Sequence, residues 1–372
     1  MRTIVFFTIL ILAGCKDPYE LPLRPSDEES LVVEGFLNSG QGGTTITLSR
    51  AVDLQGNVQF KPELGAQLFV KGKDNNTFPL AEAGNGNYTV AQLPLAAGQE
   101  YRLHIITSNG KEYQSDYIVV KQTPPIDSVS WKREGDGIGI YANTHDPANN
   151  SKYYRWEYEE TWEIHSYFEP VYKWISGSTV EPLPTGEANF RCWKYLNSSA
   201  IFIGTSSKLQ SDVIAEAPLI HIPINSEKLA VRYSILVKQY VLPKEGYEFF
   251  QLMKKNTESL GTIFDAQPSE LRGNIHCISD PGELVIGYVS ASSVEEKRIF
   301  ITDREAGGTF HMYCESISIL NDPDTIKVWM PSYLPYDAEK DPFGKILRYK
   351  ISTQPCIDCT KRGGDLNKPS YW

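Results

Sequence analysis

The stretch Tyr154-Arg155-Trp156-Glu157-Tyr158-Glu159-Glu160-Thr161-Trp162-Glu163 alternates more regularly than any other part of the chain. Even positions carry the aromatic residues Tyr154, Trp156, Tyr158 and Trp162, whereas odd positions carry Arg155, Glu157, Glu159, Thr161 and Glu163. Side chains of a β-strand point alternately to two faces, so this period of two predicts a strand with one buried or binding face and one wet face.

The aromatic face has two interpretations. Trp156, Tyr158 and Trp162, with Glu160 on the same face, could form a platform on which a sugar or an aromatic ligand stacks. Alternatively, the three rings belong to the core of a β-sandwich and Glu160 lies beyond its edge. We favour the core, because large aromatic residues dominate such cores without any ligand.

Upstream, residues 30–122 show the same alternation in short runs separated by turn residues. Asn109-Gly110 is a hairpin signal, because both central positions of a type I′ turn require positive φ. Strands are predicted at 31–37, 44–49, 66–71, 88–91, 101–107 and 112–120. Several short strands with turns between them are typical of an immunoglobulin-like β-sandwich.

The stretch Thr123-Pro124-Pro125-Ile126 predicts a linker, since proline interrupts strand pairing. Residues 126–372 are expected to form a larger β-sandwich-like domain that includes strands at 283–291 and 297–302. A helix is predicted near 243–260, with Pro243 at its start and Gly261 as its stop. Residues 164–217 are less regular and predict an insertion, which is the best candidate for contact with a partner because long loops often carry function.

The N-terminus predicts where the chain is located. Arg2 precedes an apolar block at 4–12, which has the length of a signal-peptide core and is too short to span a bilayer. Leu12-Ala13-Gly14-Cys15 resembles a lipobox, so residues 1–14 are expected to be a signal peptide and Cys15 to carry diacylglycerol and an acyl chain such as palmitate. The alternative is an ordinary secretory signal with a stray cysteine. Residues 15–29 are proline-rich and charged, which predicts a tether.

Five cysteines follow in a setting that is expected to be oxidising: Cys192, Cys277, Cys314, Cys356 and Cys359. Two disulfides and one free thiol are the simplest account, and the connectivity is open. Cys356-x-x-Cys359 could instead be a redox pair or half of a zinc site.

The formal charge of −10 argues against nucleic acid as a partner, because nucleic acid requires basic patches. The sequence contains no Gly-x-Ser-x-Gly, His-Glu-x-x-His, P-loop or dinucleotide-binding motif. Clustered oxygen ligands at Asp146, Asn149 and Asn150, and at Asp322 and Asp324, would suit calcium but fit turns equally well. We therefore predict no catalytic residue, no metal and no cofactor, and no enzymatic activity.

Several stretches together resemble one family. They are Cys15-Lys16-Asp17-Pro18-Tyr19, Leu31-Val32-Val33-Glu34-Gly35, Pro124-Pro125-Ile126-Asp127-Ser128-Val129, residues 153–163, residues 233–240, Gly261-Thr262-Ile263-Phe264-Asp265, Gly273-Asn274-Ile275 and Lys368-Pro369-Ser370-Tyr371-Trp372. The combination resembles the domain-of-unknown-function 4249 family of Bacteroidota outer-membrane lipoproteins, which are typically encoded beside TonB-dependent transporters.

The resemblance implies a lipid-anchored outer-membrane protein, exposed at the surface or facing the periplasm. On that basis we expect a binding or accessory subunit of a TonB-dependent β-barrel transporter in nutrient uptake. Two alternatives stay open: a surface hydrolase with a dispersed active site, and a structural or adhesion protein of the envelope. The family has no established catalytic residues, so the resemblance assigns none.

Overall fold

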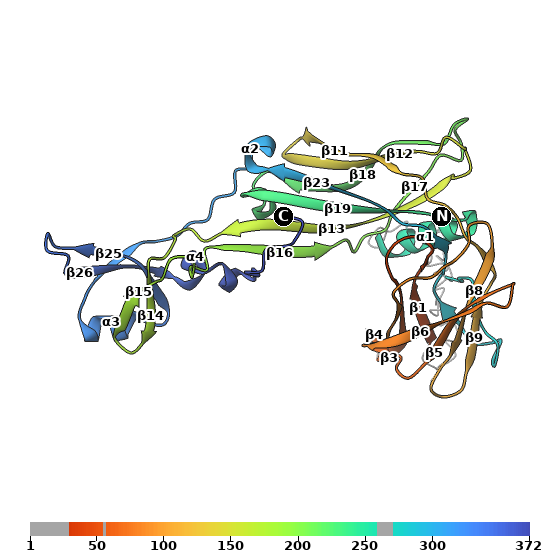
Figure 1. Cartoon of the computed structure of the whole chain (residues 1–372), viewed down its shortest axis with the longest axis horizontal. Helices are drawn as coiled ribbons and strands as arrows, with labels where there is room; N and C mark the ends of the chain where they lie inside the picture. The colour runs from red at the N-terminus through yellow and green to blue at the C-terminus, as the bar shows by residue number, and fades with distance from the viewer. Residues whose placement is uncertain (1–29, 55–56, 259–270) are drawn as a thin grey trace, which may run out of the picture.

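The computed structural model of the chain describes residues 30–54, 57–258 and 271–372. Three β-rich units lie one after another in an elongated molecule: an N-terminal sandwich, a central sandwich and a distal module (Figure 1). The predicted signal peptide, Cys15 and the tether lie outside the described residues. The described chain is mainly β, as the sequence predicts.

The N-terminal sandwich consists of an 11-stranded sheet folded over on itself and a separate two-stranded sheet. The fold lies in β6, whose first residues pair with β5 and whose last residues pair with β7. The core between the two layers includes Leu31, Ile46, Tyr88 and Leu103. Its first ten strands are β1 (Ser30–Gly35), β2 (Leu37–Asn38), β3 (Thr44–Leu54), β4 (Asn57–Pro62), β5 (Gln67–Gly72), β6 (Thr77–Gly84), β7 (Asn87–Val90), β8 (Glu100–Ile106), β9 (Glu112–Ser115) and β10 (Ile118–Val119).

A segment from much later in the chain completes this sandwich. Strand β20 (Ile275–Cys277) pairs with β9, β21 (Val285–Ile286) pairs in parallel with β1, and β22 (Ala291–Ser292) pairs with β2. The predicted boundaries, 30–122 for the sandwich and 283–291 as a strand of the second domain, did not include this return. Alternation along a strand reports its buried face and not its partner, so the sequence pattern leaves the pairing open.

A buried charge cluster fastens the returning segment. The side chain of Glu283 is 3% exposed, and its carboxylate accepts hydrogen bonds from Tyr113 Oη at 2.7 Å, Lys111 Nζ at 2.8 Å and Arg50 Nη1 at 3.1 Å. Burial by itself raises the pKa of this carboxyl group, but the three hydrogen bonds outweigh it and hold the pKa below the usual value.

This shift predicts acid sensitivity. A carboxyl group with a lowered pKa in the folded state stabilises the fold fully above its unfolded pKa of about 4.5, and that stability is lost as the pH falls through the lower folded value. We expect Glu283→Gln to be less stable than the native chain at neutral pH and to lose less stability on acidification below about pH 4.5. Urea unfolding between about pH 3 and pH 7 measures both quantities, and parallel pH profiles of the two proteins would contradict the assignment.

The central sandwich consists of two facing sheets. One has the order β11-β12-β18, and the other has the order β16-β13-β19-β23 with β17 also on β13. Their strands are β11 (Ile126–Glu134), β12 (Gly137–His145), β13 (Tyr153–His165), β16 (Arg191–Asn197), β17 (Phe202–Thr205), β18 (Val213–Pro223), β19 (Arg232–Val241) and β23 (Glu295–Thr302). The sequence stretch 154–163 therefore forms most of β13, a strand with partners along both edges.

The distal module has its own small core, which includes Tyr172, Ile326, Tyr349 and Ile351. It combines the hairpin β14 (Tyr172–Ser176) and β15 (Thr179–Pro182) with β24 (Ile317–Leu320), α3 (Pro323–Trp329), β25 (Tyr333–Lys340) and β26 (Ile346–Thr353). Residues 126–372 are thus two units, where the sequence predicted one. The predicted insertion at 164–217 contributes β14 and β15 to the module, but β16, β17 and the first part of β18 to the central sheets.

Two disulfides lie where the distal module joins the central sandwich: Cys192–Cys359 and Cys314–Cys356. Cys277 is the free, buried thiol, so the prediction of two disulfides and one thiol is confirmed. Cys356 and Cys359 bond to different partners, so the redox-pair and zinc interpretations of Cys-x-x-Cys are wrong.

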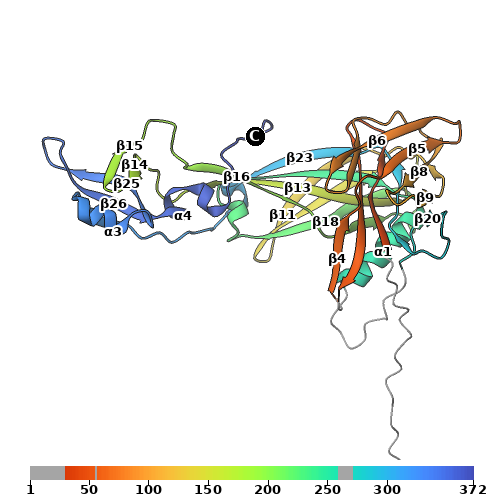
Figure 2. The same ribbon diagram turned by 90° about the horizontal axis from the view of Figure 1, so that it is seen from below.

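The described helices include the predicted one, α1 (Lys244–Glu258), which lies where the N-terminal and central units meet (Figures 1 and 2). The short helices α2 (Asp303–Ala306), α3 and α4 (Gln354–Ile357) and the 3-10 turns η1 (Glu227–Leu229) and η2 (Cys359–Arg362) are also present and were not predicted from the sequence. Within the described ranges, no helix is both long and apolar enough to cross a bilayer.

Candidate functional site

The aromatic face of β13 is buried between the two central sheets. Tyr154, Trp156, Tyr158 and Trp162 are between 0% and 9% exposed. Trp156 stacks on Tyr154 at 5.8 Å, and its Nε1 donates a hydrogen bond to Gln239 Oε1 at 2.8 Å. The platform interpretation is therefore not what the structure shows, because no ligand can reach these rings.

Glu160 lies inside the same core and not beyond its edge. It is 1% exposed, and both its oxygens accept hydrogen bonds from Lys228 Nζ at 2.6 Å while Tyr233 Oη donates to Oε1 at 2.8 Å. The burial and the neighbouring carboxylate together raise the pKa of the Tyr233 hydroxyl well above its usual value. Glu160 is thus a structural carboxylate with three hydrogen bonds.

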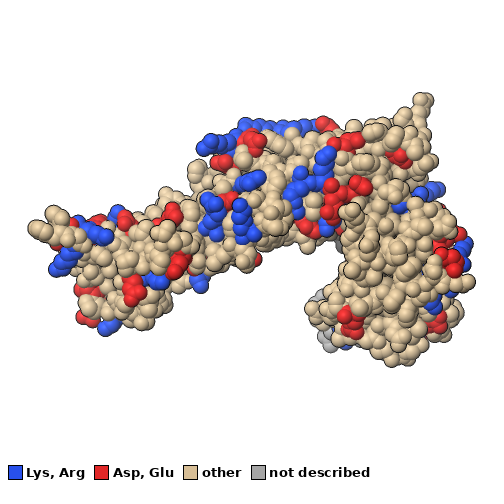
Figure 3. Space-filling view, in the orientation of Figure 1, with Lys and Arg blue, Asp and Glu red and all other residues tan. Residues whose placement is uncertain are grey.

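The odd residues of β13 point to the other side of the sheet. Near the C-terminus, Tyr371 and Trp372 cover part of this face: the hydroxyls of Tyr371 and Thr161 are 2.8 Å apart, and Trp372 Nε1 donates to Glu163 Oε2 at 3.0 Å. On the surface, Lys and Arg side chains are interspersed with Asp and Glu over the central part of the molecule (Figure 3). At the other end of β13, Arg155 and Glu157 face a cleft.

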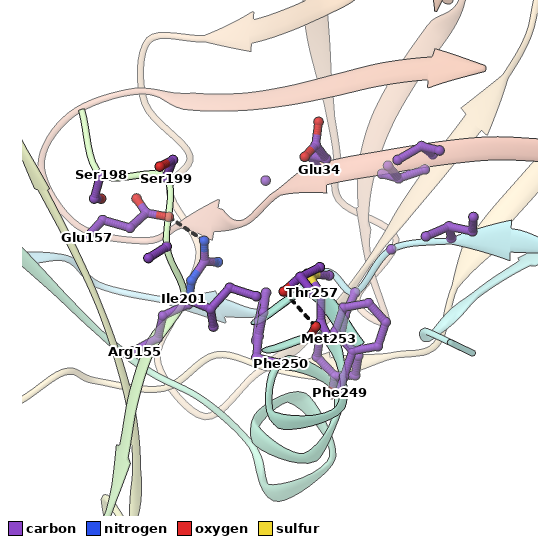
Figure 4. Close-up of a pocket in the computed structure, with 17 residues that line it drawn as sticks. Glu34, Arg155, Glu157, Ser198, Ser199, Ile201, Phe249, Phe250, Met253 and Thr257 are labelled. Carbon is purple, nitrogen blue, oxygen red and sulfur yellow. Dashed lines mark hydrogen bonds and ion pairs between the residues drawn. The ribbon is translucent and has the colours of Figure 1, made fainter. Parts of the chain in front are cut away.

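This junction cleft lies between the N-terminal sandwich, β13 and α1, and has a volume of about 470 Å³ (Figure 4). One wall is residues 32–35 of β1 with residues 286–288 of the returning segment. Phe249, Phe250, Met253 and Thr257 of α1 form the facing wall. Residues 198–201, which connect β16 to β17, close one side. Every structural unit except the distal module contributes to the cleft.

One ion pair dominates the polar part of the junction cleft. The guanidinium of Arg155 bonds Glu157 Oε1 and lies over the ring of Phe250, 4.3 Å from its centroid. Tyr240 Oη donates to Glu157 Oε2 at 2.8 Å, and burial followed by the charge of Glu157 raises the pKa of Tyr240. Figure 4 shows the pair between the Ser198–Ser199 side and the aromatic wall. The cleft therefore offers an apolar surface beside a fixed positive and negative group, which suits an amphipathic ligand.

A second cleft, of about 820 Å³, lies on another side of α1 and includes Tyr117, Glu245, Glu248 and Leu252. Tyr288 lines both clefts. Burial, and then the charges of Glu245 and Asp116, raise the pKa of Tyr288 to about 12, so its hydroxyl is protonated and available as a donor at neutral pH.

The two candidate calcium clusters serve turns. Asp146 accepts hydrogen bonds from the backbone N–H groups of Ala148, Asn150 and Ser151. Asp322 caps α3 by accepting from the N–H groups of Asp324 and Thr325. Over the part of the chain that the structure describes, no three His, Cys, Asp or Glu side chains are grouped so that they could hold a metal ion.

The sequence did not reveal the junction cleft. Its helix was predicted, and residues 198–201 fall in the insertion that was expected to carry function. However, the alternation assigns Arg155 and Glu157 only to the solvent-facing side of a strand. Nothing in the nearby sequence indicates that β1 and residues 286–288 close over them. A pair of opposite charges near the start of the strand is the single signal that was available.

The sequence matches the family described as Domain of unknown function (DUF4249) over residues 16–298. The chain belongs to this family. The match to DUF4249 covers the N-terminal sandwich, the junction cleft and most of the central sandwich, and ends before the distal module's β24. None of the curated proteins matches the chain.

Solved structures similar to this DUF4249 chain include a putative carbohydrate binding protein from Bacteroides uniformis, at 12% identity and a TM-score of 0.16, covering 58% of this chain and 91% of that one. A DUF3823 family protein from Bacteroides ovatus is 14% identical, with a TM-score of 0.12, and covers 57% of this chain and 91% of its own. The chicken interferon gamma receptor alpha chain is 12% identical, with a TM-score of 0.15, and covers 56% and 87%. At these scores the likenesses carry no functional argument.

Proposed function

We propose that this DUF4249 protein is a lipid-anchored binding protein of the outer membrane that works as an accessory subunit of a TonB-dependent transporter. The observation that carries the binding role is the junction cleft, because ligand sites form preferentially between domains and combine an apolar wall with a few fixed polar groups. The lipobox-like stretch before Cys15 and the family membership support the location and the partner.

The architecture also suits an accessory subunit. The N-terminal and central units are joined through the linker: Thr123 Oγ1 donates to the backbone carbonyl of Ser293, beside β22, at 2.5 Å and accepts from the N–H of Val241 in β19 at 3.3 Å. Gln239 Nε2 of β19 also donates to the carbonyl of Pro124 at 2.8 Å. A firm junction holds the two walls of the cleft at a fixed separation. The binding site is then preorganised, which reduces the entropic cost of binding.

The anchor and the partner are tested on the full-length chain in its native membrane. We expect Cys15→Ser to release the protein into the soluble fraction, because the acyl chains on Cys15 are the only proposed attachment of the native protein to the bilayer. Affinity purification of the native chain from gently solubilised outer membrane should recover a β-barrel transporter, identified by mass spectrometry. A Cys15→Ser protein that stays membrane-bound would contradict the anchor, and recovery of the native chain alone would contradict the partner.

The ligand role has a separate readout in the same preparation. Native mass spectrometry of the purified chain is expected to show a small bound molecule that disappears in Met253→Arg, which places a long cation inside the junction cleft. The matched control is Leu252→Arg, because the neighbouring helix position lines the second cleft instead. If both variants retain or both lose the bound molecule, the junction cleft is not the site.

A further inference from the structure

A third cleft lies between the N-terminal sandwich and the edge strand β23, with a volume of about 690 Å³. We call it the glycine-loop cleft, because residues 40–43, Gly-Gln-Gly-Gly, line one side. Opposite the loop lie Lys238 and Tyr240 of β19 and Glu295 and Glu296 of β23, and the linker residue Gln122 also lines the cleft. It is separate from the junction cleft, although Tyr240 and its acceptor Glu157 lie between the two.

The loop has a fixed shape. The side chain of Asn38 accepts from the N–H of Gly40 at 2.9 Å and donates to the carbonyl of Gln41 at 2.9 Å, and Asn38 is itself 3% exposed. Gly42 has a φ of +95°, a conformation that side-chain-bearing residues rarely adopt. A Cβ on Gly40 would be 3.2 Å from the Cβ of Ser293, so glycine lets the loop approach the opposite wall. The cleft is therefore built by the fold and not left by a loose surface loop.

The polar groups of the glycine-loop cleft are of mixed character. Lys238 is a donor, held by Glu159 at 2.5 Å and by the more distant Glu296 at 3.8 Å. Glu295 is an acceptor when ionised, and burial raises the pKa of its carboxyl group. The amide of Gln122 both donates and accepts, and one of its N–H bonds is fixed on Ser293 Oγ. Phe36 supplies an apolar ring, which packs edge to face on Tyr240 at 4.6 Å.

From this combination we infer that the glycine-loop cleft binds an uncharged, hydroxyl-rich ligand of the saccharide class. A hydroxyl group donates and accepts, so it can pair with Glu295, Lys238 and Gln122 alike. An anion in the cleft would be repelled by the carboxylates of Glu295 and Glu296, and an ammonium group would be repelled by the ammonium of Lys238. The volume lies within the range of about 300–1,000 Å³ that small-molecule sites occupy.

The test uses the full-length chain in a polyoxyethylene detergent, so that no sugar headgroup competes. Neutral tetrasaccharides of glucose, mannose, galactose and xylose are titrated by calorimetry, alongside glucosamine and galacturonate as cationic and anionic probes. We expect at least one neutral sugar to bind, and Glu295→Gln to weaken its binding about tenfold or more, because a hydrogen bond to a charged group is replaced by a neutral one. The matched control is Glu181→Gln, because Glu181 is exposed on β15 of the distal module, lines none of the three clefts and should leave the affinity unchanged.

Thermal unfolding of Glu295→Gln establishes that the variant is folded before its affinity is compared. Stronger binding of glucosamine or galacturonate than of any neutral sugar would overturn the inference, as would equal affinities of the native chain and Glu295→Gln. Lack of binding by every sugar at millimolar concentration would also overturn it. Since the readout concerns this cleft alone, its failure leaves the junction cleft and the transporter proposal standing.

Discussion

Trp156→Ala is expected to lower the free energy of unfolding by about 3–5 kcal/mol, the largest effect of any single substitution considered for this chain. Trp156 is 1% exposed, stacks on Tyr154 and lies in the centre of the central sandwich core. Removing the indole leaves a cavity that the two sheets cannot close without moving. It also leaves Gln239 Oε1 without its 2.8 Å hydrogen bond inside the core. Guanidinium chloride unfolding, monitored by circular dichroism, measures the loss.

Two further variants separate the causes. Trp156→Phe retains part of the ring but removes the N–H, so its loss should be smaller than that of alanine and reports the hydrogen bond together with a small cavity. Tyr313→Ala is the control, because Tyr313 is 90% exposed and its truncation should change stability by less than about 0.5 kcal/mol. A loss below about 1 kcal/mol for Trp156→Ala would show that the ring is not part of a closed core.

Lys228→Met is expected to cost about 3 kcal/mol of stability, because it leaves the carboxylate of Glu160 buried without its cation. Lys228 donates to both oxygens of Glu160, and after its removal only the hydrogen bond from Tyr233 remains on that carboxylate among the contacts described above. The ammonium also lies 5.4 Å from the centroid of the Trp162 ring, which is a smaller part of the loss. The free energy of unfolding in urea is again the measurement.

The double variant Glu160→Gln, Lys228→Met tests the explanation. A neutral amide in place of the carboxylate removes the buried charge and still accepts from Tyr233, so the double variant should be more stable than Lys228→Met alone. Lys132→Met is the matched control: its partner Glu216 lies at 3.0 Å on the surface, where such pairs contribute about 0–1 kcal/mol. Strict additivity of the two single losses would argue against coupling of Glu160 with Lys228.

These two sites show how far the sequence pattern reaches. The alternation at 154–163 correctly predicted that one face of the strand carries large rings, and the core interpretation placed them inside a sandwich. It failed for Glu160, since a carboxylate on an aromatic face was assumed to lie past the core's edge. The cation that accompanies it comes from Lys228 in η1, 68 residues later in the sequence. Such a long-range partner leaves no local signal.

The sequence by itself determined the β-rich class, the alternation of β13, the helix now seen as α1, the number of disulfides and the family. These properties follow from the spacing of apolar residues, the composition and the number of cysteines. Each of these can be read from the sequence without knowing which segments become neighbours in the fold. Only the tertiary structure decided that residues 275–292 return to the N-terminal sandwich and that 126–372 divides into two units. It also decided that three clefts form where the N-terminal sandwich meets the central unit. The physical reason is that a strand's pattern states which face is buried but leaves its hydrogen-bonding edges equivalent, so the choice of neighbour is made by packing over the whole chain.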